Sequence, residues 1–391
     1  MTTPRAEFLE HLLEISHTMP ADNVAGVVAE HAAQVGLRDL DLYLVDYEQV
    51  YLVPLPRPGG TAEPVPIDST LAGRAFIATA VVTTPVEGGE RIWVPLLDGA
   101  ERLGVLCVTV AEADADAVAL TSALASVAAL LVVSKNSYTD VQEKSRRTRV
   151  PDLAAELQLQ LLPPLTLTHP KIAIAGVLEN AYETGGDAFD YAVNGPTAHF
   201  GIFDAMGHGM SASLMAAAVV AAYRGSRRQS FDLAATYAAL DEVVVTHFGE
   251  GQFVTAQIGQ LDIVTGEFAW VNAGHPGPLI VRQLRNANTL DRSPSLPLGL
   301  GAAEVEVAVD RLSPGDRLLF YSDGVVEARA PTGEPFGDLR LADELKKQCL
   351  DGMSPPETMR RLLHAVIGHH GAQLTDDATM VLVEWPGPTQ P

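Results

Sequence analysis

The chain has 391 residues, of which 47% are hydrophobic and 19% are charged, so it is long enough to bury the cores of two domains. It carries 26 basic and 49 acidic residues, and its formal net charge is -23. Because this charge repels nucleic-acid phosphates and anionic lipid headgroups, the composition argues against a nucleic-acid-binding or membrane-surface protein. The two cysteines, Cys107 and Cys349, are too few and too far apart for a disulfide framework or a cysteine-based zinc site.

The first residues, MTTPRAEFLEHLLEI, alternate charged and apolar side chains at helical spacing and lack the continuous apolar core of a signal peptide. We therefore expect a cytoplasmic protein. Residues 117–133 contain no charged side chain, which raises a transmembrane helix as an alternative. The run is short and rich in small residues, so we favour a buried or dimer-forming helix. Its larger residues at packing spacing are Leu120, Leu124, Val127 and Leu131.

Residues 5–133 have the pattern of a separate α/β domain. Two amphipathic helices, FLEHLLEI and NVAGVVAEHAAQVG, precede the strand-like runs DLYLVDY and VYLVPL and the short helix STLAGRAFIATA. IWVPLL and RLGVLCV flank an Asp-Gly turn and predict a hairpin. This order, closed by the apolar helix, resembles a GAF sensory domain. The resemblance implies regulation by a small-molecule or protein input.

Residues 134–163 predict a helical linker between two domains. The first part is polar and charged, and Leu153, Leu157 and Leu161 then fall on one helical stripe that ends at Pro163. Two interpretations stay open, namely a solvated tether and a helix that transmits the state of the first domain to the second.

Residues 164–386 mix strands and helices without regular alternation, with helices expected over 211–223, 231–247 and 338–368. This pattern predicts an antiparallel-rich α+β domain or β-sandwich. Carboxylates stand at the ends of predicted strands, and such groups repel one another at the rim of a sheet unless a cation neutralises them. Oxygen ligands without cysteine or paired histidine favour Mg²⁺ or Mn²⁺. The carboxylates are Asp187, Asp204, Asp323 and Asp376, and the backbone carbonyl of Ala205 is a further candidate ligand.

Five ordered motifs lie in this half: GGDAFD, FDAMGHGMSASLMA, VNAGHPGPLI, LLFYSDGVVEAR and DDATMVLVEW, with LQLQLLPP just upstream. Their order and spacing resemble the bacterial sporulation-stage-II-E-like branch of the metal-dependent PPM, or protein phosphatase 2C, superfamily. The resemblance covers residues 151–386 and implies a β-sandwich flanked by helices, with two Mn²⁺ or Mg²⁺ ions at one end. It implies that the ions are held by Asp187, Asp204, Asp323, Asp376 and the carbonyl of Ala205.

Other polar residues of these motifs are candidates for positions around the metals or the phosphate. Strand parity turns Asp190 away from Asp187 and Asp377 away from Asp376. His208 is expected either to donate to a phosphate or to cap the following helix. Asn272 and His275 are expected to brace a turn between strands, with direct catalysis as the alternative.

Together these features predict a cytoplasmic, metal-dependent protein serine/threonine phosphatase controlled by a GAF-like domain. By analogy with the branch, its substrate would be a phosphorylated STAS-domain anti-sigma-factor antagonist. The alternatives are a degenerate scaffold that binds phosphoproteins and a hydrolase of small phosphate esters. We also expect a homodimer formed through helix 117–133, and no nucleic-acid or membrane partner.

Overall fold

The computed structural model describes residues 4–179, 185–282, 286–290, 292–301, 305–371, 374 and 376–388. The chain divides into two compact units, residues 1–150 and residues 151–391. Each unit contains its own hydrophobic clusters. This division falls inside the predicted linker, 134–163, so that stretch contributes helices to both units.

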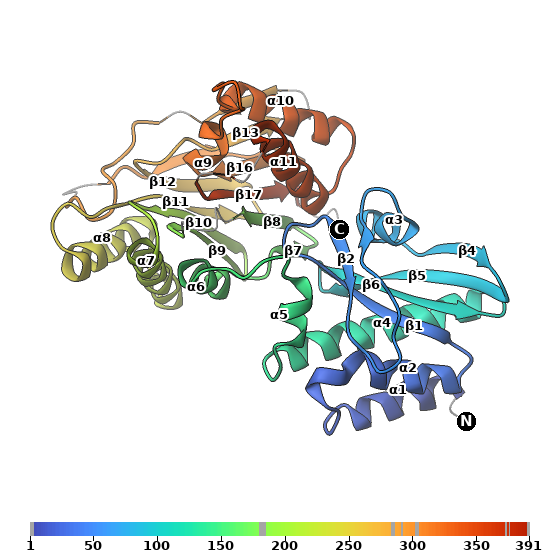
Figure 1. Cartoon of the computed structure of the whole chain (residues 1–391). Coiled ribbons are helices and arrows are strands. Elements are labelled where there is room, and N and C mark those ends of the chain that lie inside the picture. The colour runs from blue at the N-terminus through green and yellow to red at the C-terminus, as the bar shows by residue number, and fades with distance from the viewer. Residues whose placement is uncertain are drawn as a thin grey trace. The chain divides into compact units, whose positions relative to one another are not determined.

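The N-terminal unit is an α/β domain built on one antiparallel sheet. In its described residues, the strands have the order β3-β2-β1-β6-β5-β4. Helices α1, α2 and α4 pack on one face, and α3 covers the other (Figure 1). The elements are α1 (Pro4–Ile15), η1 (Ala21–Asn23), α2 (Val24–Gln34), β1 (Arg38–Val45), β2 (Tyr51–Pro54), β3 (Val65–Pro66), α3 (Leu71–Ala78), β4 (Val82–Val86), β5 (Gly89–Asp98), β6 (Glu101–Val110), α4 (Ala115–Asn136) and α5 (Val141–Arg146).

Strands β5 and β6 form the predicted hairpin. Asp98 pairs with Glu101, so the loop consists of Gly99 and Ala100. Gly99 has a φ of 58°, a left-handed conformation that a residue without Cβ adopts at little cost. The helices and strands predicted for this half are confirmed, while its assignment as a GAF domain stays a prediction.

Helix α4 is long and apolar enough to cross a membrane by length and composition. In the structure, however, Leu124 is fully buried in the core of the N-terminal unit, and Leu120 and Leu131 are buried with it. The prediction that this stripe forms dimer contacts is therefore wrong, because the stripe packs against the helix's own domain. The large hydrophobic side chains that α4 exposes are Leu130, at 57%, and Val133, at 40%.

The C-terminal unit is a sandwich of two antiparallel sheets between two layers of helices (Figure 1). In its described residues, one sheet has the order β15-β12-β11-β10-β9 and the other the order β14-β13-β16-β17-β8-β7. Helices α6, α7 and α8 cover the first sheet, and α9, α10 and α11 cover the second. An aromatic core that includes Phe189, Phe200 and Phe320 fills the space between the sheets. The predicted antiparallel α+β sandwich is confirmed.

The elements of this unit are α6 (Leu153–Leu161), β7 (Thr166–His169), β8 (Ile172–Glu179), β9 (Asp187–Asn194), β10 (Thr197–Ala205), α7 (Met210–Arg228), α8 (Leu233–Phe248), β11 (Val254–Asp262), β12 (Glu267–Ala273), β13 (Leu279–Arg282), β14 (Asn286–Thr289), β15 (Ala308–Arg311), β16 (Asp316–Tyr321), α9 (Asp323–Glu327), α10 (Gly337–Leu350), α11 (Pro355–His370) and β17 (Ala378–Trp385). The single helix expected over 338–368 is two helices, because Pro355 cannot donate a backbone hydrogen bond and therefore begins α11.

Helix α6 ends at Leu161, just before Pro163, as predicted, but its leucine stripe does not form the buried face. Leu153 is 72% exposed, whereas Ala154, Ala155 and Gln158 are buried. The hydroxyl oxygen of Ser213 on α7 lies 3.4 Å from the carbonyl oxygen of Ala154. At this close approach α6 presents its small side chains to α7, and the leucine stripe is not its buried face.

Candidate metal centre

The first half of the site is formed by the neighbouring strands β9 and β10. Asp187 begins β9, Asp204 lies one residue before the end of β10, and the antiparallel register places the two residues opposite each other. Asp187 is buried, and Asp204 is partly buried. A Cβ atom on Gly186 would lie 2.6 Å from the carbonyl oxygen of Ala205, so only glycine allows this approach.

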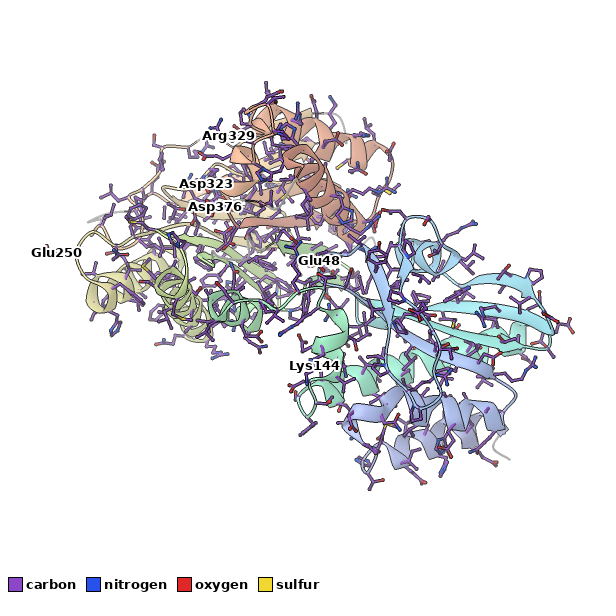
Figure 2. All side chains as sticks on the ribbon, in the orientation of Figure 1. Glu48, Lys144, Glu250, Asp323, Arg329 and Asp376 are labelled. Carbon is purple, nitrogen blue, oxygen red and sulfur yellow. The ribbon has the colours of Figure 1, made fainter. Side chains whose placement is uncertain are left out.

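The second half comes from the other sheet. Strand β16 ends at Tyr321, and Asp323 begins the short helix α9; Asp376 lies two residues before β17. The two segments touch, because a Cβ atom on Gly324 would lie 2.0 Å from the carbonyl oxygen of Asp377. Asp323 and Asp376 are exposed and lie close together at this edge of the unit (Figure 2).

Asp377 joins the two halves. Its Oδ2 atom accepts a hydrogen bond from the amide nitrogen of Asp187, at 3.3 Å, and another from Nε2 of Gln158, at 2.8 Å. Its own amide nitrogen donates to Oδ1 of Asp376 at 2.9 Å. The structure therefore brings the four predicted aspartates to one edge of the sandwich, with Asp377 as a buried connection between them.

The carboxylates raise one another's pKa. Burial, followed by the charges of Asp204 and Asp377, raises the pKa of Asp187 well above its ordinary value. Burial and the charge of Asp323, with smaller contributions from Asp376 and Asp377, raise the pKa of Asp204 to about 7. Burial and neighbouring carboxylates also raise the pKa values of Asp323 and Asp376. At neutral pH the cluster therefore favours either a bound proton or a bound cation.

The donor atoms suit a hard divalent cation. Among the described residues, the buried Oδ2 atom of Asp187 has no hydrogen-bond partner, which leaves an anionic oxygen available as a ligand. The other donors are carboxylate and carbonyl oxygens, which Mg²⁺ and Mn²⁺ prefer. Within the described part of the chain, no group of three or more His, Cys, Asp or Glu side chains is arranged to hold a metal ion as it stands.

Asp190 is separate from this cluster. Its carboxylate is 2% exposed and accepts hydrogen bonds from Arg224, at 2.9 Å, and from Arg227, both on α7. Its position three residues after Asp187 turns it toward the helix, as strand parity predicts. Asp190 therefore connects β9 to α7 through a buried ion pair.

Asn272 and His275 brace a turn beside the cluster. The amide of Asn272 donates to the carbonyl oxygen of His275 at 2.9 Å, and the amide nitrogen of His275 donates back to Asn272 at 2.8 Å. Burial lowers the pKa of His275 to about 4, so its ring is neutral at physiological pH. These contacts agree with the predicted turn-bracing role.

The neutral His275 ring determines where the hydroxyl proton of Thr255 points. Nε2 of His275 lies 3.0 Å from the carbonyl oxygen of Tyr321, which can only accept, so this nitrogen carries the proton. Nδ1 is then an acceptor for the hydroxyl of Thr255, at 2.8 Å. Because that hydroxyl has one proton, Oδ2 of Asp204, 3.5 Å away, stays available to a cation.

His208 lies at the rim of the site and does not cap α7. The N-cap residue of that helix is Gly209, which has no side chain to accept a hydrogen bond. Burial raises the pKa of Asp376, and the charge of His208 acts in the opposite direction. His208 is exposed, and it lies close enough to Asp376 for its charge to act on that carboxylate.

Sequence reasoning missed Gln158, Thr255 and Ser322. The hydroxyl of Ser322 accepts from the amide nitrogen of Thr379 at 3.1 Å and lies 3.4 Å from the carbonyl oxygen of Asp377. The motif LQLQLLPP could have marked Gln158 as a candidate, because two glutamines stand among its leucines. The sequence does not show which of the two is buried.

Comparisons with known proteins match the part of the chain that contains this cluster. The family model described as Stage II sporulation protein E (SpoIIE) matches residues 194–386, which include Asp204, Asp323 and Asp376. Protein IcfG of Synechocystis sp. (strain ATCC 27184 / PCC 6803 / Kazusa) is 30% identical over 146 residues, 37% of this chain and 22% of that protein. Phosphoserine phosphatase RsbU of Bacillus subtilis (strain 168) is 22% identical over 235 residues, 59% of this chain and 69% of that protein.

Among solved structures, the crystal structure of the RsbU and RsbW domains of Rv1364c from Mycobacterium tuberculosis is 27% identical and superposes with a TM-score of 0.51. The superposition covers 56% of this chain and 63% of that one, so the chain spans less than two thirds of this structure and about a fifth of IcfG. The family match, the sandwich fold and the ordered motifs all fall in the same half of the sequence. Over residues 194–386 the C-terminal unit of the chain therefore matches the family described as Stage II sporulation protein E (SpoIIE).

Proposed function

We propose that the chain is a metal-dependent protein serine/threonine phosphatase. The observation that carries the proposal is the meeting of Asp187 and Asp204 from one sheet with Asp323 and Asp376 from the other at a single edge. Four carboxylates gathered in this way are unfavourable unless positive charge neutralises them. Binding of divalent cations explains why the fold keeps them together.

In this proposal two Mn²⁺ or Mg²⁺ ions would be held by Asp187, Asp204, Asp323, Asp376 and the carbonyl of Ala205. When bound, such ions would polarise phosphoryl oxygens and lower the pKa of a water molecule. The chain's own residues place the ligands: the β9–β10 register sets Asp187 opposite Asp204, and Thr255 leaves Oδ2 of Asp204 available. The exposed Asp323 and Asp376 keep the edge open to a phosphorylated side chain of another protein.

For the substrate, we propose a phosphorylated STAS-domain anti-sigma-factor antagonist. The similarity to a relative named phosphoserine phosphatase RsbU supports phosphoserine as the target. We further propose that the N-terminal unit is a GAF-like domain that regulates the phosphatase unit, and that the protein is cytoplasmic. A homodimer stays a prediction, and its contact on α4 would use Leu130 and Val133.

The test is release of inorganic phosphate by the full chain from a panel of phosphorylated STAS-domain proteins, compared with free phosphoserine and other small phosphate esters. Release from a phosphoprotein that depends on Mn²⁺ or Mg²⁺ supports the proposal. Much faster turnover of small esters would instead indicate a small-ester hydrolase. Binding of phosphoproteins without any release would indicate a scaffold.

A further inference from the structure

A cavity of about 390 Å³ lies in the N-terminal unit, beside α2. Its volume falls within the range of roughly 300 to 1,000 Å³ that is typical of sites for small organic molecules. The opposite face of the sheet, under α3, is filled by buried side chains that include Tyr43, Phe76 and Trp93. All residues that line the cavity belong to the N-terminal unit, so this site is not part of the proposed phosphatase site.

Part of the cavity wall is apolar. Gly26, Ala29 and Ala33 follow one another at intervals of three and four residues, so they lie on one face of α2. These small side chains leave room between the helix and the start of β1. The buried Leu37 and Leu40 extend the apolar wall. Such a wall suits the methylene groups of a ligand.

Two carboxylates from different elements also line the cavity. Glu30 lies on α2 and Asp39 lies near the start of β1, and both residues are exposed. The pairing of β1 with β6 shifts between Arg38 and Asp41, and Asp39 has a φ of 49°. Asp39 thus stands in a bulge, a feature that redirects a side chain out of the regular strand pattern. Within the described residues, neither Glu30 nor Asp39 has an ion-pair partner, so both are available to a cation.

The basic group of the cavity is Arg57, in the loop that follows β2. Its Nε atom donates to Oδ1 of Asp41 at 2.8 Å. This ion pair is partly buried, with 21% of the Arg57 side chain and 17% of the Asp41 side chain exposed, and it fixes the guanidinium on the cavity wall. Among the described contacts, Nη1 and Nη2 of Arg57 make no hydrogen bond. A guanidinium held in this way can donate both nitrogens to a carboxylate.

The amide of Asn23 completes the polar lining. A Cβ atom on Gly26 would lie 2.2 Å from Oδ1 of Asn23, so the glycine leaves room for the amide in this position. The Asn23 side chain does not cap α2, although the residue holds the N-cap position. Its amide is therefore available to a ligand.

We propose that this cavity binds a free amino acid, and that a basic amino acid such as lysine fits it best. Arg57 donates to the α-carboxylate, while Glu30 and Asp39 accept from ammonium groups. The three carboxylates Glu30, Asp39 and Asp41 outnumber the single guanidinium, so a ligand with two positive charges and one negative charge matches the lining better than an acidic one. This inference goes beyond the proposed function and does not depend on the phosphatase reaction.

The test is calorimetric titration of the full chain with L-lysine and with two of its analogues. The analogue 1,5-diaminopentane lacks the α-carboxylate, and 6-aminohexanoic acid lacks the α-ammonium group. L-Lysine should bind about 10-fold or more tightly than either analogue, because loss of a hydrogen bond between charged groups has an effect of this order. L-Glutamate should bind more weakly than L-lysine, because its second carboxylate meets unpaired acidic side chains.

Two variants and one control locate the bound amino acid. Ala33→Phe fills the cavity from an exposed position of α2 and should abolish binding of L-lysine. Gln34→Phe changes the neighbouring exposed position, which does not line the cavity, and should leave binding unchanged. Arg57→Gln removes the guanidinium, so L-lysine and 1,5-diaminopentane should bind to this variant equally. The last comparison is made within one variant and is therefore independent of its stability.

No binding of L-lysine at millimolar concentration, or equal binding of L-lysine and 1,5-diaminopentane to the unaltered chain, overturns the inference. Binding that survives in Ala33→Phe also overturns it, because the amino acid would then lie elsewhere. If Ala33→Phe does not fold, Arg57→Gln decides, since a preference for L-lysine that survives in Arg57→Gln overturns the role of the guanidinium and with it the inference. The proposed phosphatase function stands or falls separately, by release of phosphate.

Discussion

Asp187 on β9 and Asp204 on β10 are directly opposite each other in the antiparallel register, with Asp187 buried. Two like charges directly opposite on neighbouring strands destabilise a sheet. Burial is the main cause of the raised pKa of both side chains, and the charge of Asp204 adds to it at Asp187. The pair therefore binds a proton or a cation in the folded protein, and the predictions below use this property.

Asp204→Asn should lower kcat with Mn²⁺ by on the order of 100-fold or more, because a direct ligand matters at least as much as an outer contact. The melting temperature of the metal-free protein should stay the same or rise, since the amide relieves repulsion. Phosphate release and a thermal melt in chelator measure the two effects. A sharp fall in the metal-free melting temperature would show a structural role instead.

Asp190→Asn should have the opposite profile. It removes the charge that pairs with Arg224 and Arg227, so we expect the free energy of unfolding to fall by about 3 kcal/mol. The dissociation constant for Mn²⁺ should not change, because Asp190 faces α7 rather than the cluster. Urea unfolding and calorimetric titration measure these quantities. Loss of Mn²⁺ binding with unchanged stability would place Asp190 among the metal ligands.

The metal-free protein should show a pH dependence that originates at Asp204. The pKa of Asp204 is about 7 in the folded protein and 3.8 ordinarily, so the folded state holds a proton that the unfolded state releases. The resulting stability is fully present below a pH of about 4 and is lost as the pH rises through about 7. The difference between the melting temperature of the unaltered protein and that of Asp204→Asn should therefore decrease as the pH rises over this range. A difference that is constant with pH would contradict the raised pKa.

Binding of Mn²⁺ should show the reverse dependence, because the cation displaces the proton. Affinity should rise as the pH rises toward about 7 and then level off. Calorimetric titration at several pH values in matched ionic strength tests this expectation. An affinity that increases on acidification would exclude Asp204 as a ligand.

His275→Ala should reduce the free energy of unfolding by about 1 to 3 kcal/mol, because it leaves Thr255 and the Tyr321 carbonyl without a buried partner. The pKa of His275 is lowered to about 4, so its contribution is present above the ordinary value of 6.5 and is lost as the pH falls through about 4. The pH profile of kcat near neutrality should keep its shape. A shifted profile would indicate that His275 transfers protons in the reaction.

On α4, Leu124→Ala and Leu130→Glu should have different effects. Leu124 is fully buried, so its truncation should cost about 2 to 5 kcal/mol of unfolding free energy. Leu130 is largely exposed, so the charged substitution should leave the fold intact and separate any homodimer. Thermal melts and light scattering measure the two outcomes. If Leu130→Glu changes neither the mass nor the melting temperature, α4 forms no contact between copies at this position.

The positions of the clustered aspartates could be predicted because their signals are local. An apolar strand run, a carboxylate and a small residue follow one another directly at Asp204, and a similar order recurs at Asp323. The hairpin of β5 and β6 was predictable for the same reason, since its Asp-Gly turn lies between two apolar runs.

Contacts over long sequence separations could not be predicted. The bond from Gln158 to Asp377 spans 219 residues, and no local pattern tells Gln158 from Gln160. Helical periodicity predicts the apolar stripe of α4 but not the surface that covers it. In the structure, Leu124 packs inside its own domain. In α6 the close approach of α7 favours burial of the alanine side chains rather than burial of the leucine stripe.

The most direct measurement is release of phosphate from a phosphorylated STAS-domain protein as Mn²⁺ is titrated into the metal-free full chain, with Asp204→Asn beside it. We predict release that rises with Mn²⁺ to a plateau, disappears in excess chelator and is absent from Asp204→Asn. Equal release in chelator, or equal release by Asp204→Asn, would contradict a metal-dependent reaction at this carboxylate cluster.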